Sequence, residues 1–401
     1  MPKISTDKKA IDSFLTRAVE NVYPSPEELK KTLLKGKQIS IYLGIDPTGP
    51  TLHLGHLIPM RKLAELQKLG HKIILLIGDF TAMIGDPTDK KATRQPLTRK
   101  QVLANCKGYK EQASKILNFS GSNPVELKFN SDWLAKMTFE DILELTSHFT
   151  VQQMVQRDMF KKRIKDDKPI AITEFMYPLM QGYDSVVMDV DMEVGGNDQT
   201  FNMMAGRHLM KTISNKEKFV LTTKLLVDPT GTKMGKTEGN MISLSDSPED
   251  MYGKVMSWSD SMIAQGFELL TDIPMKEITA MEKAMKKGEN PVMFKRQLAR
   301  KVVSEFVSEA EAEKAEKNFS KVFTAHQAPE DIPVVKIGKG STSLIDALVT
   351  TKLVTSNSEA RRAIEQGGVK VDEKVVKDIT AKVKAPVTIQ KGKRHFVRLT
   401  S

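Results

Sequence analysis

The sequence contains a single cysteine, Cys106, and no long run of hydrophobic residues. One cysteine cannot form an internal disulfide, which indicates a reducing compartment. No apolar stretch approaches the roughly 20 residues that a membrane-spanning helix requires, and the polar start from Met1 to Ala10 lacks the apolar core of a signal peptide. We therefore expect a cytoplasmic protein with no membrane partner, in which Cys106 is a packing residue without a catalytic role.

Aromatic residues are also scarce, at 6% of the chain, whereas 40% of the residues are hydrophobic and 28% are charged. These values are typical of a globular protein, and 401 residues are enough for two or three domains. The charge is unevenly spread. Residues 336–401 hold 14 lysines and arginines against 6 acidic residues, a net charge of +8, whereas the rest of the chain carries only +3. A basic terminal module on a nearly neutral body predicts a polyanionic partner.

Residues 39–80 have the pattern of a strand, a turn, a helix and a second strand. Ile39–Leu43 is a short apolar run followed by the turn-forming stretch Asp46–Pro50. Apolar residues then recur at helical spacing from Leu54 to Leu69, and Ile73–Ile77 is apolar throughout, as in a strand buried on both faces. This pattern predicts an α/β fold with a doubly wound, Rossmann-like parallel sheet, whose ligands bind at the carboxyl ends of the strands.

The remaining pattern predicts three domains. We expect helices around 98–118, 138–165, 173–183 and 200–210, a strand at Ser185–Val190, and only helices from 248 to about 322. Residues 326–340 are rich in proline and glycine and are predicted to be a linker. Helices at 343–348 and 358–366 then precede β-like runs at 369–371 and 387–399. The predicted domains are a Rossmann-like catalytic domain (1–228), a loop and α-helical domain (229–330), and a linker with a small α+β domain (331–401).

The string His53-Leu54-Gly55-His56 lies at the start of the first predicted helix. Two histidines alone do not complete a zinc site, and no further Cys/His cluster lies nearby in the sequence, so no metal site is predicted. The free N–H groups and positive dipole end of a helix N-terminus favour phosphate, and Gly55 allows a nucleotide to approach the backbone. We expect both imidazoles to donate hydrogen bonds to phosphate oxygens.

A second string, Lys233-Met234-Gly235-Lys236-Thr237, follows the apolar residues Leu225–Val227, which we take as the end of a buried strand. Two lysines flanking a glycine can close over a triphosphate and neutralise charge on the departing pyrophosphate. Such strings are common in solvated turns when they occur alone. Together with the histidine string roughly 180 residues upstream, it resembles the signature pair of class I aminoacyl-tRNA synthetases.

Several residue roles are implied by this resemblance. It implies catalytic roles for His53, His56, Lys233 and Lys236. It also implies an ATP site that contains Asp46, Gly55, Gly196, Asp198 and Lys236. ATP is then a substrate, Mg²⁺ arrives with it, and no tightly bound cofactor is expected.

Substrate identity is suggested by Tyr177, Gln181 and Asp184, which are spaced to share one helix face. Polar groups in such an apolar segment are costly to bury unless a ligand or partner satisfies them. The string from Tyr177 to Asp184, followed by Gly195–Gln199, is similar to the tyrosine pocket of bacterial-type tyrosyl-tRNA synthetases. The resemblance implies that Asp184 accepts from the phenol, that Asp198 binds the ribose and that Tyr42 is a second phenol contact. The implied tyrosine-binding residues are Tyr42, Asp86, Tyr177, Gln181, Asp184 and Gln199.

The block Gly78–Pro87 and the loop after it also resemble this family. The resemblance implies that Asp86 helps to bind the ammonium group of the amino acid. It further implies that Lys90, Lys91 and Arg94 form a cationic lid over the pyrophosphate, and we expect Lys90 and Arg94 to act in catalysis. Asp89 departs from the family pattern, which usually has glycine there.

The C-terminal module resembles the RNA-binding domain of the ribosomal protein S-four type. This resemblance rests on Ser343–Leu348 and on the string from Ser358 to Asp372, which includes Gly367-Gly368. We expect Arg361, Arg362, Lys370 and Lys374 to bind RNA. Phe396 is the only aromatic residue that accompanies them, so shape and phosphate contacts are favoured over base stacking.

The sequence therefore predicts a tyrosine–tRNA ligase activity with L-tyrosine, ATP and tRNA(Tyr) as substrates, and the family resemblance implies a homodimer. Three alternatives remain at this stage. Tryptophanyl-tRNA synthetases share the two signature strings, although the Tyr/Gln/Asp face favours tyrosine. A small-molecule adenylyltransferase would not need a basic RNA-binding module. A catalytically silent RNA-binding paralogue would have lost some signature residues, and none is missing.

Overall fold

The computed structural model describes residues 2–86, 97–233, 241–323, 333–336, 340–392 and 395–400. The chain divides into two compact units. The first comprises Met1–Ser247 and Lys254–Leu298, and the second comprises Pro248–Gly253 and Ala299–Ser401. The three-domain division at residues 228 and 330 stays a prediction. No helix within the described ranges combines the length and the apolar character that crossing a membrane requires.

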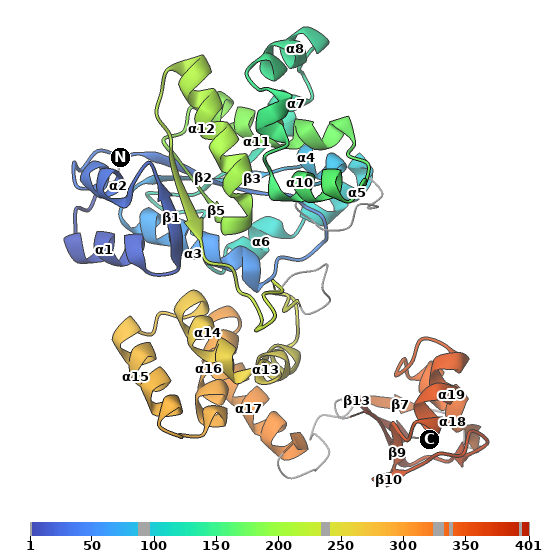
Figure 1. Ribbon diagram of the computed structural model, residues 1–401. Helices are drawn as coiled ribbons and strands as arrows, with labels where there is room; N and C mark the ends of the chain where they lie inside the picture. The colour runs from blue at the N-terminus through green and yellow to red at the C-terminus, as the bar shows by residue number, and fades with distance from the viewer. Residues whose placement is uncertain are drawn as a thin grey trace. The chain divides into compact units, whose positions relative to one another are not determined.

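The first unit is built on a six-stranded sheet (Figure 1) with the strand order β1-β6-β5-β2-β3-β4. All neighbouring strands are parallel except β1, which pairs antiparallel with β6 at one edge. The strands are β1 (Val19–Tyr23), β2 (Ser40–Ile45), β3 (Lys72–Ile77), β4 (Glu126–Phe129), β5 (Met192–Gly196) and β6 (Phe219–Thr223).

The central strands read as apolar runs because helices cover both faces of the sheet. Ile73 to Ile77 of β3 are all buried and pair in register with Ile41 to Ile45 of β2. From the neighbouring strands β2 and β5 the chain moves outward in opposite directions, through α3 to β3 and through α12 to β6. Right-handed crossovers then put α3 and α12 on opposite faces. The predicted doubly wound parallel sheet is confirmed, and its switch point lies between β2 and β5.

Helices supply most of the rest of the first unit, and short 3₁₀ helices lie at Asn197–Gln199 and Asp260–Met262. Helices α13 (Pro248–Met256) and α16 (Pro291–Phe306) have residues in both units, and α17 (Glu309–Phe323) belongs to the second. The helices wholly within the first unit are α1 (Lys8–Thr16), α2 (Pro26–Leu33), α3 (Leu54–Lys68), α4 (Thr81–Ile84), α5 (Arg99–Cys106), α6 (Tyr109–Ala113), α7 (Ser131–Leu134), α8 (Phe139–Ser147), α9 (Val151–Met154), α10 (Asp158–Lys165), α11 (Ile172–Met188), α12 (Thr200–Ser214), α14 (Ile263–Leu270) and α15 (Met275–Lys286).

Several predicted elements are displaced. The strand expected at Ser185–Val190 is wrong, because α11 continues to Met188 and ends at Asp189, which has a left-handed backbone with φ of 47°. The β-branched pair Val186-Val187 produced the error, since packing of α11 overrides its strand propensity. The strand itself is β5, from Met192 to Gly196. The strand before the lysine loop ends at Thr223, so Leu225–Val227 already lies beyond it.

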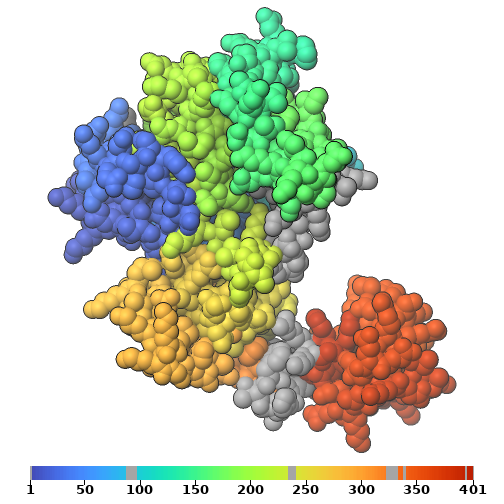
Figure 2. All heavy atoms as spheres, in the orientation of Figure 1, coloured from blue at the N-terminus to red at the C-terminus, as the bar shows by residue number. Residues whose placement is uncertain are grey.

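A compact module (Figure 2) is formed by Val334–Lys336 and the described residues from 340 onward. It has a hydrophobic core of its own. Its main sheet has the order β10-β9-β12-β13-β7, and β7 pairs with β13 in parallel. The core consists of buried aliphatic side chains, among them Leu344, Leu348, Ile364, Ile389 and Leu399. The elements are β7 (Val334–Lys336), β8 (Thr342–Ser343), α18 (Leu344–Thr350), α19 (Asn357–Glu365), β9 (Val369–Val371), β10 (Lys374–Val375), β11 (Lys382–Val383), β12 (Val387–Lys391) and β13 (His395–Thr400).

The linker prediction for residues 326–340 is therefore wrong for Val334–Lys336. These residues add a parallel edge strand to the C-terminal sheet, through pairing with Arg398, Leu399 and Thr400. Three residues are too few to give a strand signal by alternation, and the neighbouring proline and glycines indicate a loop. Residues 324–332 lie outside the described part of the chain.

Candidate active site

A cavity of about 490 Å³ opens at the carboxyl ends of β2, β3, β5 and β6. This is the edge where a doubly wound sheet binds its ligands. Most of the predicted site residues line this cavity. They are Tyr42, Asp46, His53, Gly55, His56, Asp86, Tyr177, Gln181, Asp184, Gly196, Asp198, Gln199 and Lys233. Four residues with predicted roles, Lys90, Lys91, Arg94 and Lys236, lie outside the described residues.

His53 and His56 form the N-terminus of α3 and stack with ring centroids 3.8 Å apart. The Gly55 N–H donates to His53 Nδ1 at 3.1 Å, and the His53 N–H donates to His56 Nδ1 at 3.2 Å. Because each Nδ1 is an acceptor, each ring carries its proton on Nε2. Burial, followed by the charges of His53 and Lys233, lowers the pKa of His56 well below its usual range. The helix start therefore presents two Nε2–H donors at the cavity wall, and His56 is held in its neutral form.

Tyr177, Gln181 and Asp184 occupy successive turns of α11 and share the face toward the cavity. The Tyr177 hydroxyl donates to Asp46 Oδ2 at 2.8 Å, and Gln181 Nε2 donates to Glu193 Oε1 at 3.0 Å. Burial, followed by the negative charge of Asp46, raises the pKa of the Tyr177 phenol well above its ordinary value. Tyr177 is therefore a neutral donor.

Asp184 is only 2% exposed and accepts from two side chains that the sequence did not indicate. Trp133 Nε1 donates at 2.8 Å and Asn130 Nδ2 at 3.3 Å. Burial raises the pKa of this carboxyl well above its usual value, and the two hydrogen bonds oppose that effect. Asn130 follows β4 directly, and a polar residue after a strand end was a signal for it.

Asp86 lies in a polar cluster whose cation the sequence did not indicate. Arg157, on the segment before α10, pairs with Asp86 Oδ1 at 3.1 Å. Gln199 Nε2 donates to Asp86 Oδ2 at 2.7 Å, and Asn202 Nδ2 donates to the same oxygen at 3.3 Å. The predicted pair Asp86 and Gln199 is thus brought together. No sequence signal set Arg157 apart from the other basic residues around it.

At the other end of the cavity, Asp198 and Lys233 form an ion pair of 2.9 Å. Asp198 lies in the 3₁₀ helix after β5, and Lys233 begins the lysine string. The carboxylate expected at a ribose and the cation expected at phosphates are therefore neighbours. Gly196 ends β5 on the same wall.

Asp46 lies at a crowded position after β2. Its carboxylate accepts from Tyr177 and from Thr81, whose hydroxyl is 2.8 Å from Oδ1. A Cβ on Gly78 would come within 2.0 Å of Asp46 Oδ1, so only glycine fits there. The sequence predicted that Asp46 belongs to the ATP site. Its hydrogen bond from Tyr177 also connects it to the polar face of α11.

Tyr42 is fully buried on β2, and its hydroxyl lies 2.9 Å from Ser185 Oγ. Ser185 in turn accepts from Lys218, which forms an ion pair with Glu193. None of Ser185, Glu193 and Lys218 was predicted. Glu193 follows Met192 in β5, and a carboxylate within an apolar strand was the available signal.

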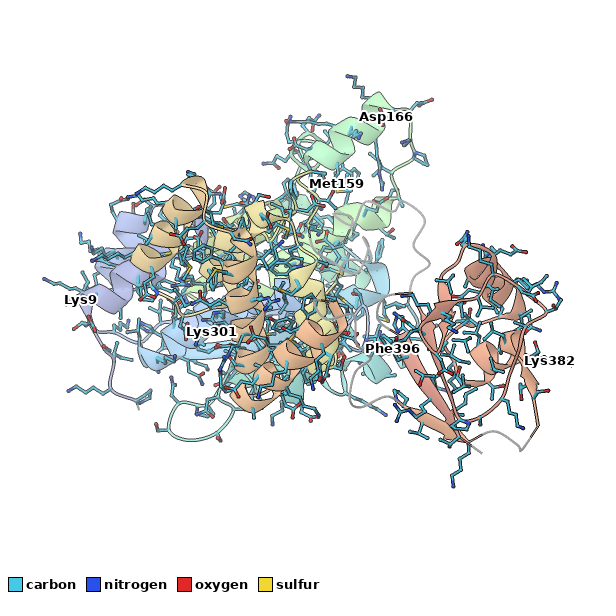
Figure 3. All side chains as sticks on the ribbon, turned by 90° about the horizontal axis from the view of Figure 1, so that it is seen from below. Lys9, Met159, Asp166, Lys301, Lys382 and Phe396 are labelled. Carbon is cyan, nitrogen blue, oxygen red and sulfur yellow. The ribbon has the colours of Figure 1, made fainter. Side chains whose placement is uncertain are left out.

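The four predicted RNA-binding residues lie on one helix and on one pair of antiparallel strands of the C-terminal module. Arg361 and Arg362 are exposed on α19, Lys370 is half-buried on β9, and Lys374 is exposed on the adjoining β10. Figure 3 shows long side chains extending outward from this module, with Lys382 at its edge. These basic side chains therefore project from elements that pack on the aliphatic core of the module.

Two family models match the chain. The model described as tRNA synthetases class I (W and Y) matches residues 34–324. The model described as Tyrosine–tRNA ligase SYY-like C-terminal domain matches residues 324–398. Between them they account for the α/β unit, the helical segment and the C-terminal module.

Curated relatives match almost the full length. The tyrosine–tRNA ligase of Haemophilus ducreyi is 44% identical over 394 residues, which is 98% of each chain. That of Carboxydothermus hydrogenoformans is 42% identical over 399 residues, which is 96% of each chain.

Solved structures share the fold. A C-terminally truncated mitochondrial tyrosyl-tRNA synthetase of Coccidioides posadasii has a TM-score of 0.62 and 26% identity, covering 77% of this chain and 92% of its own. The tyrosyl-tRNA synthetase of Archaeoglobus fulgidus, solved in complex with L-tyrosine, has a TM-score of 0.59 and 21% identity. That match covers 77% of this chain and 99% of the archaeal chain, and at this identity it supports the fold alone.

Proposed function

Because this chain belongs to the tyrosine–tRNA ligases, within the class I tRNA synthetases, we propose that its cavity joins L-tyrosine to ATP and that its C-terminal module holds tRNA(Tyr). The observation that carries the proposal is the composition of one cavity wall. It brings together the histidine pair at a helix N-terminus, the polar face of α11 and the first lysine of the loop.

The amino acid would lie along the α11 face. Asp184 accepts the phenolic hydrogen of tyrosine, and Tyr42 contacts the phenolic oxygen. At the other end of the amino acid, Tyr177, Gln181, Asp86 and Gln199 surround the ammonium group, with Asp46 beside Tyr177. Burying these polar groups is costly, and a substrate that satisfies them recovers that cost. This supports selection of tyrosine over an apolar amino acid.

The nucleotide would lie between α3 and the end of β5. Gly55 and Gly196 let ATP approach the backbone, and Asp198 accepts from the ribose hydroxyls. The Nε2–H donors of His53 and His56 face the triphosphate. Lys233, together with Lys236, Lys90 and Arg94, neutralises the leaving pyrophosphate. Mg²⁺ comes in as part of MgATP and spreads the charge of the phosphates.

The reaction has two steps. An oxygen of the tyrosine carboxylate attacks the α-phosphorus of ATP, and the bond from that phosphorus to the bridging oxygen breaks, so pyrophosphate leaves. A hydroxyl of the terminal ribose of tRNA then attacks the carbonyl carbon of tyrosyl-adenylate. AMP leaves with the electrons of the acyl–oxygen bond, and its phosphate takes up the proton that the hydroxyl loses. Neither step needs a nucleophile from the protein. Catalysis therefore consists of positioning and charge stabilisation.

We further propose a homodimer. Large apolar side chains are exposed on α8, α9 and the first residue of α11, including Phe139 at 75%, Val151 at 66% and Ile172 at 79%. These elements share one core cluster around Leu145, Met154 and Leu179, so the exposed side chains belong to one part of the first unit. A second copy would cover such a surface. We also infer a cytoplasmic location, which fits the single cysteine.

Exchange of pyrophosphate into ATP tests the activation step. Each of the twenty amino acids is supplied in turn to the full-length protein with MgATP. We expect exchange with tyrosine alone, followed by charging of tRNA(Tyr). Exchange that depends on tryptophan, or on no amino acid, would contradict the proposal. Sedimentation of the same preparation measures the oligomeric state.

A further inference from the structure

Lys218 lies immediately before β6, and its side chain has no exposed surface. Its ammonium group pairs with Glu193, which is 2% exposed, and donates to Ser185 Oγ at 2.8 Å. Burying a lysine is costly unless its charge and its donors are satisfied. The reaction described above makes no use of this lysine. The cost of burying Lys218 therefore calls for an explanation outside the direct chemistry of that reaction.

The space for this ammonium group is provided by a glycine on α12. A Cβ on Gly206 would lie 2.5 Å from Lys218 Nζ and 2.9 Å from Ser185 Oγ. Any other residue at 206 would displace the ammonium group or the hydroxyl. The contact between Lys218 and Ser185 is thus supported from three elements: α11, α12 and the start of β6.

Lys218 sets the direction of a chain of hydrogen bonds that ends at the cavity. An ammonium group can only donate, so Ser185 Oγ accepts from it. Among the described residues, the hydrogen of Ser185 then has one acceptor, the Tyr42 oxygen at 2.9 Å. The Tyr42 hydrogen is left with the Gln181 carbonyl at 3.5 Å, the long limit of a hydrogen bond.

Lys218 also weakens a second acceptor for the Tyr42 hydrogen, the carboxylate of Glu193. Burial, followed by the negative charge of Glu193, raises the pKa of the Tyr42 phenol well above its ordinary value, so this carboxylate attracts the phenolic hydrogen. Lys218 and Gln181 donate to the two oxygens of that carboxylate, through Oε2 and Oε1 respectively. With both oxygens engaged, Glu193 attracts the phenolic hydrogen less strongly. Without Lys218, that hydrogen would turn toward Glu193.

We propose that Lys218 is a positioning residue for tyrosine selection, which acts through Ser185 to present the Tyr42 hydroxyl as a donor to the phenolic oxygen of the substrate. The inference rests on the proposed function, because it assigns Tyr42 and Asp184 to the substrate phenol. The phenol then receives a hydrogen bond from Tyr42 and donates its own hydrogen to Asp184. Phenylalanine can do neither, so the direction of the chain contributes to its rejection.

The test compares tyrosine with phenylalanine in ATP–pyrophosphate exchange by the full-length protein. Ser185→Ala breaks the chain and leaves the Lys218–Glu193 pair intact, whereas Lys218→Met with Glu193→Gln removes the pair together. Loss of one hydrogen bond should lower the tyrosine-to-phenylalanine ratio of kcat/KM about 3- to 10-fold. The KM for tyrosine should rise while the KM for ATP stays constant. Lys216→Met is the matched control, because Lys216 pairs with Asp189 and Asp191 instead.

A double variant separates this role from a structural one. If Ser185 acts through Tyr42, Ser185→Ala with Tyr42→Phe should lose no more selectivity than Tyr42→Phe alone. Equal losses for tyrosine and phenylalanine, or an unchanged ratio in Ser185→Ala, would overturn the inference. If the Lys218 variants fail to fold, Ser185→Ala still decides. Failure of the wild-type protein to activate tyrosine would contradict the proposed function instead, so the two failures are distinguishable.

Discussion

The cavity of the first unit and the surface of the C-terminal module hold their charges in opposite ways. In the cavity, Asp184 and Glu193 are each 2% exposed and have partners from distant parts of the chain. In the module, Arg361, Arg362 and Lys374 extend into solvent from an aliphatic core. Buried groups are weakly screened and discriminate by geometry, whereas exposed cations attract phosphate generally and are screened by salt. We therefore expect the cavity to select the amino acid and the module to bind the polyanion.

The largest effect is expected at Asp184. Asp184→Ala should remove most of the preference for tyrosine over phenylalanine, because the substrate hydroxyl loses its buried acceptor. The preference at stake is about 10⁴- to 10⁵-fold, a range known for tyrosyl enzymes themselves. Competitive ATP–pyrophosphate exchange measures it. Asp184→Asn keeps an acceptor for Trp133 and should lose less. An unchanged preference in Asp184→Ala would remove this carboxylate from the pocket.

Lys233→Ala should slow formation of the adenylate about 10²- to 10³-fold, since a charge that stabilises the transition state is lost. The dissociation constant for tyrosine should hardly change, because the lysine pairs with Asp198 at the nucleotide end of the cavity. Single-turnover kinetics gives both quantities. Lys211→Ala, which removes a half-exposed lysine paired with Glu217, is the control. A change confined to tyrosine affinity would contradict a catalytic role for Lys233.

The module is tested by ending the chain at residue 330. The shortened protein should keep ATP–pyrophosphate exchange and lose charging of tRNA. In the full chain, tRNA binding should weaken roughly 40-fold between 50 and 200 mM salt if about three phosphate contacts are made. Exchange should not follow this salt dependence. Undiminished charging by the shortened chain would show that the module is not the tRNA-binding element.

The smallest effect concerns His71, which is fully buried and directly precedes β3 in the first unit. Its Nε2 has no hydrogen-bond partner within the described residues, and burial lowers the pKa of the imidazole to about 4. The unfolded chain, with a pKa near 6.5, binds more protons between these values. The contribution of neutral His71 to stability is therefore fully present above about pH 6.5 and is lost as the pH falls toward 4. At pH 5 the free energy of unfolding is lower by about 2 kcal/mol.

Urea unfolding at pH 7.5 and pH 5 checks this pH dependence. Trp133 and Trp258 are the only tryptophans and both belong to the first unit, so their fluorescence reports on the unit that contains His71. His71→Asn keeps an acceptor for the Ile39 N–H and should reduce the loss of stability at pH 5. His395→Asn, on the exposed end of β13, should leave it unchanged. The same loss in His71→Asn as in the wild type would assign it to other groups.

Secondary-structure predictions that rest on local patterns were confirmed, whereas those that depend on contacts between distant segments were wrong or were missed. The βαβ pattern of residues 39–80 was confirmed because apolar periodicity is local and strong. The strand predicted at Ser185–Val190 was wrong, since Val186-Val187 has strand propensity but lies in α11, which packs as a whole against α12. The three-residue strand β7 was missed because its partner, β13, lies some 60 residues away in the sequence.

What the sequence determined by itself were the segments that carry chemistry: the histidine pair at a helix start, the polar face of α11 and the basic terminal module. Each is a short pattern, so neighbouring residues suffice to specify it. Only the tertiary structure decided the partners. Asp86 pairs with Arg157, Asp184 with Trp133, and Glu193 with Lys218. A carboxylate can be satisfied by any donor that the fold brings within about 3 Å, and that distance is set by the packing of helices on the sheet.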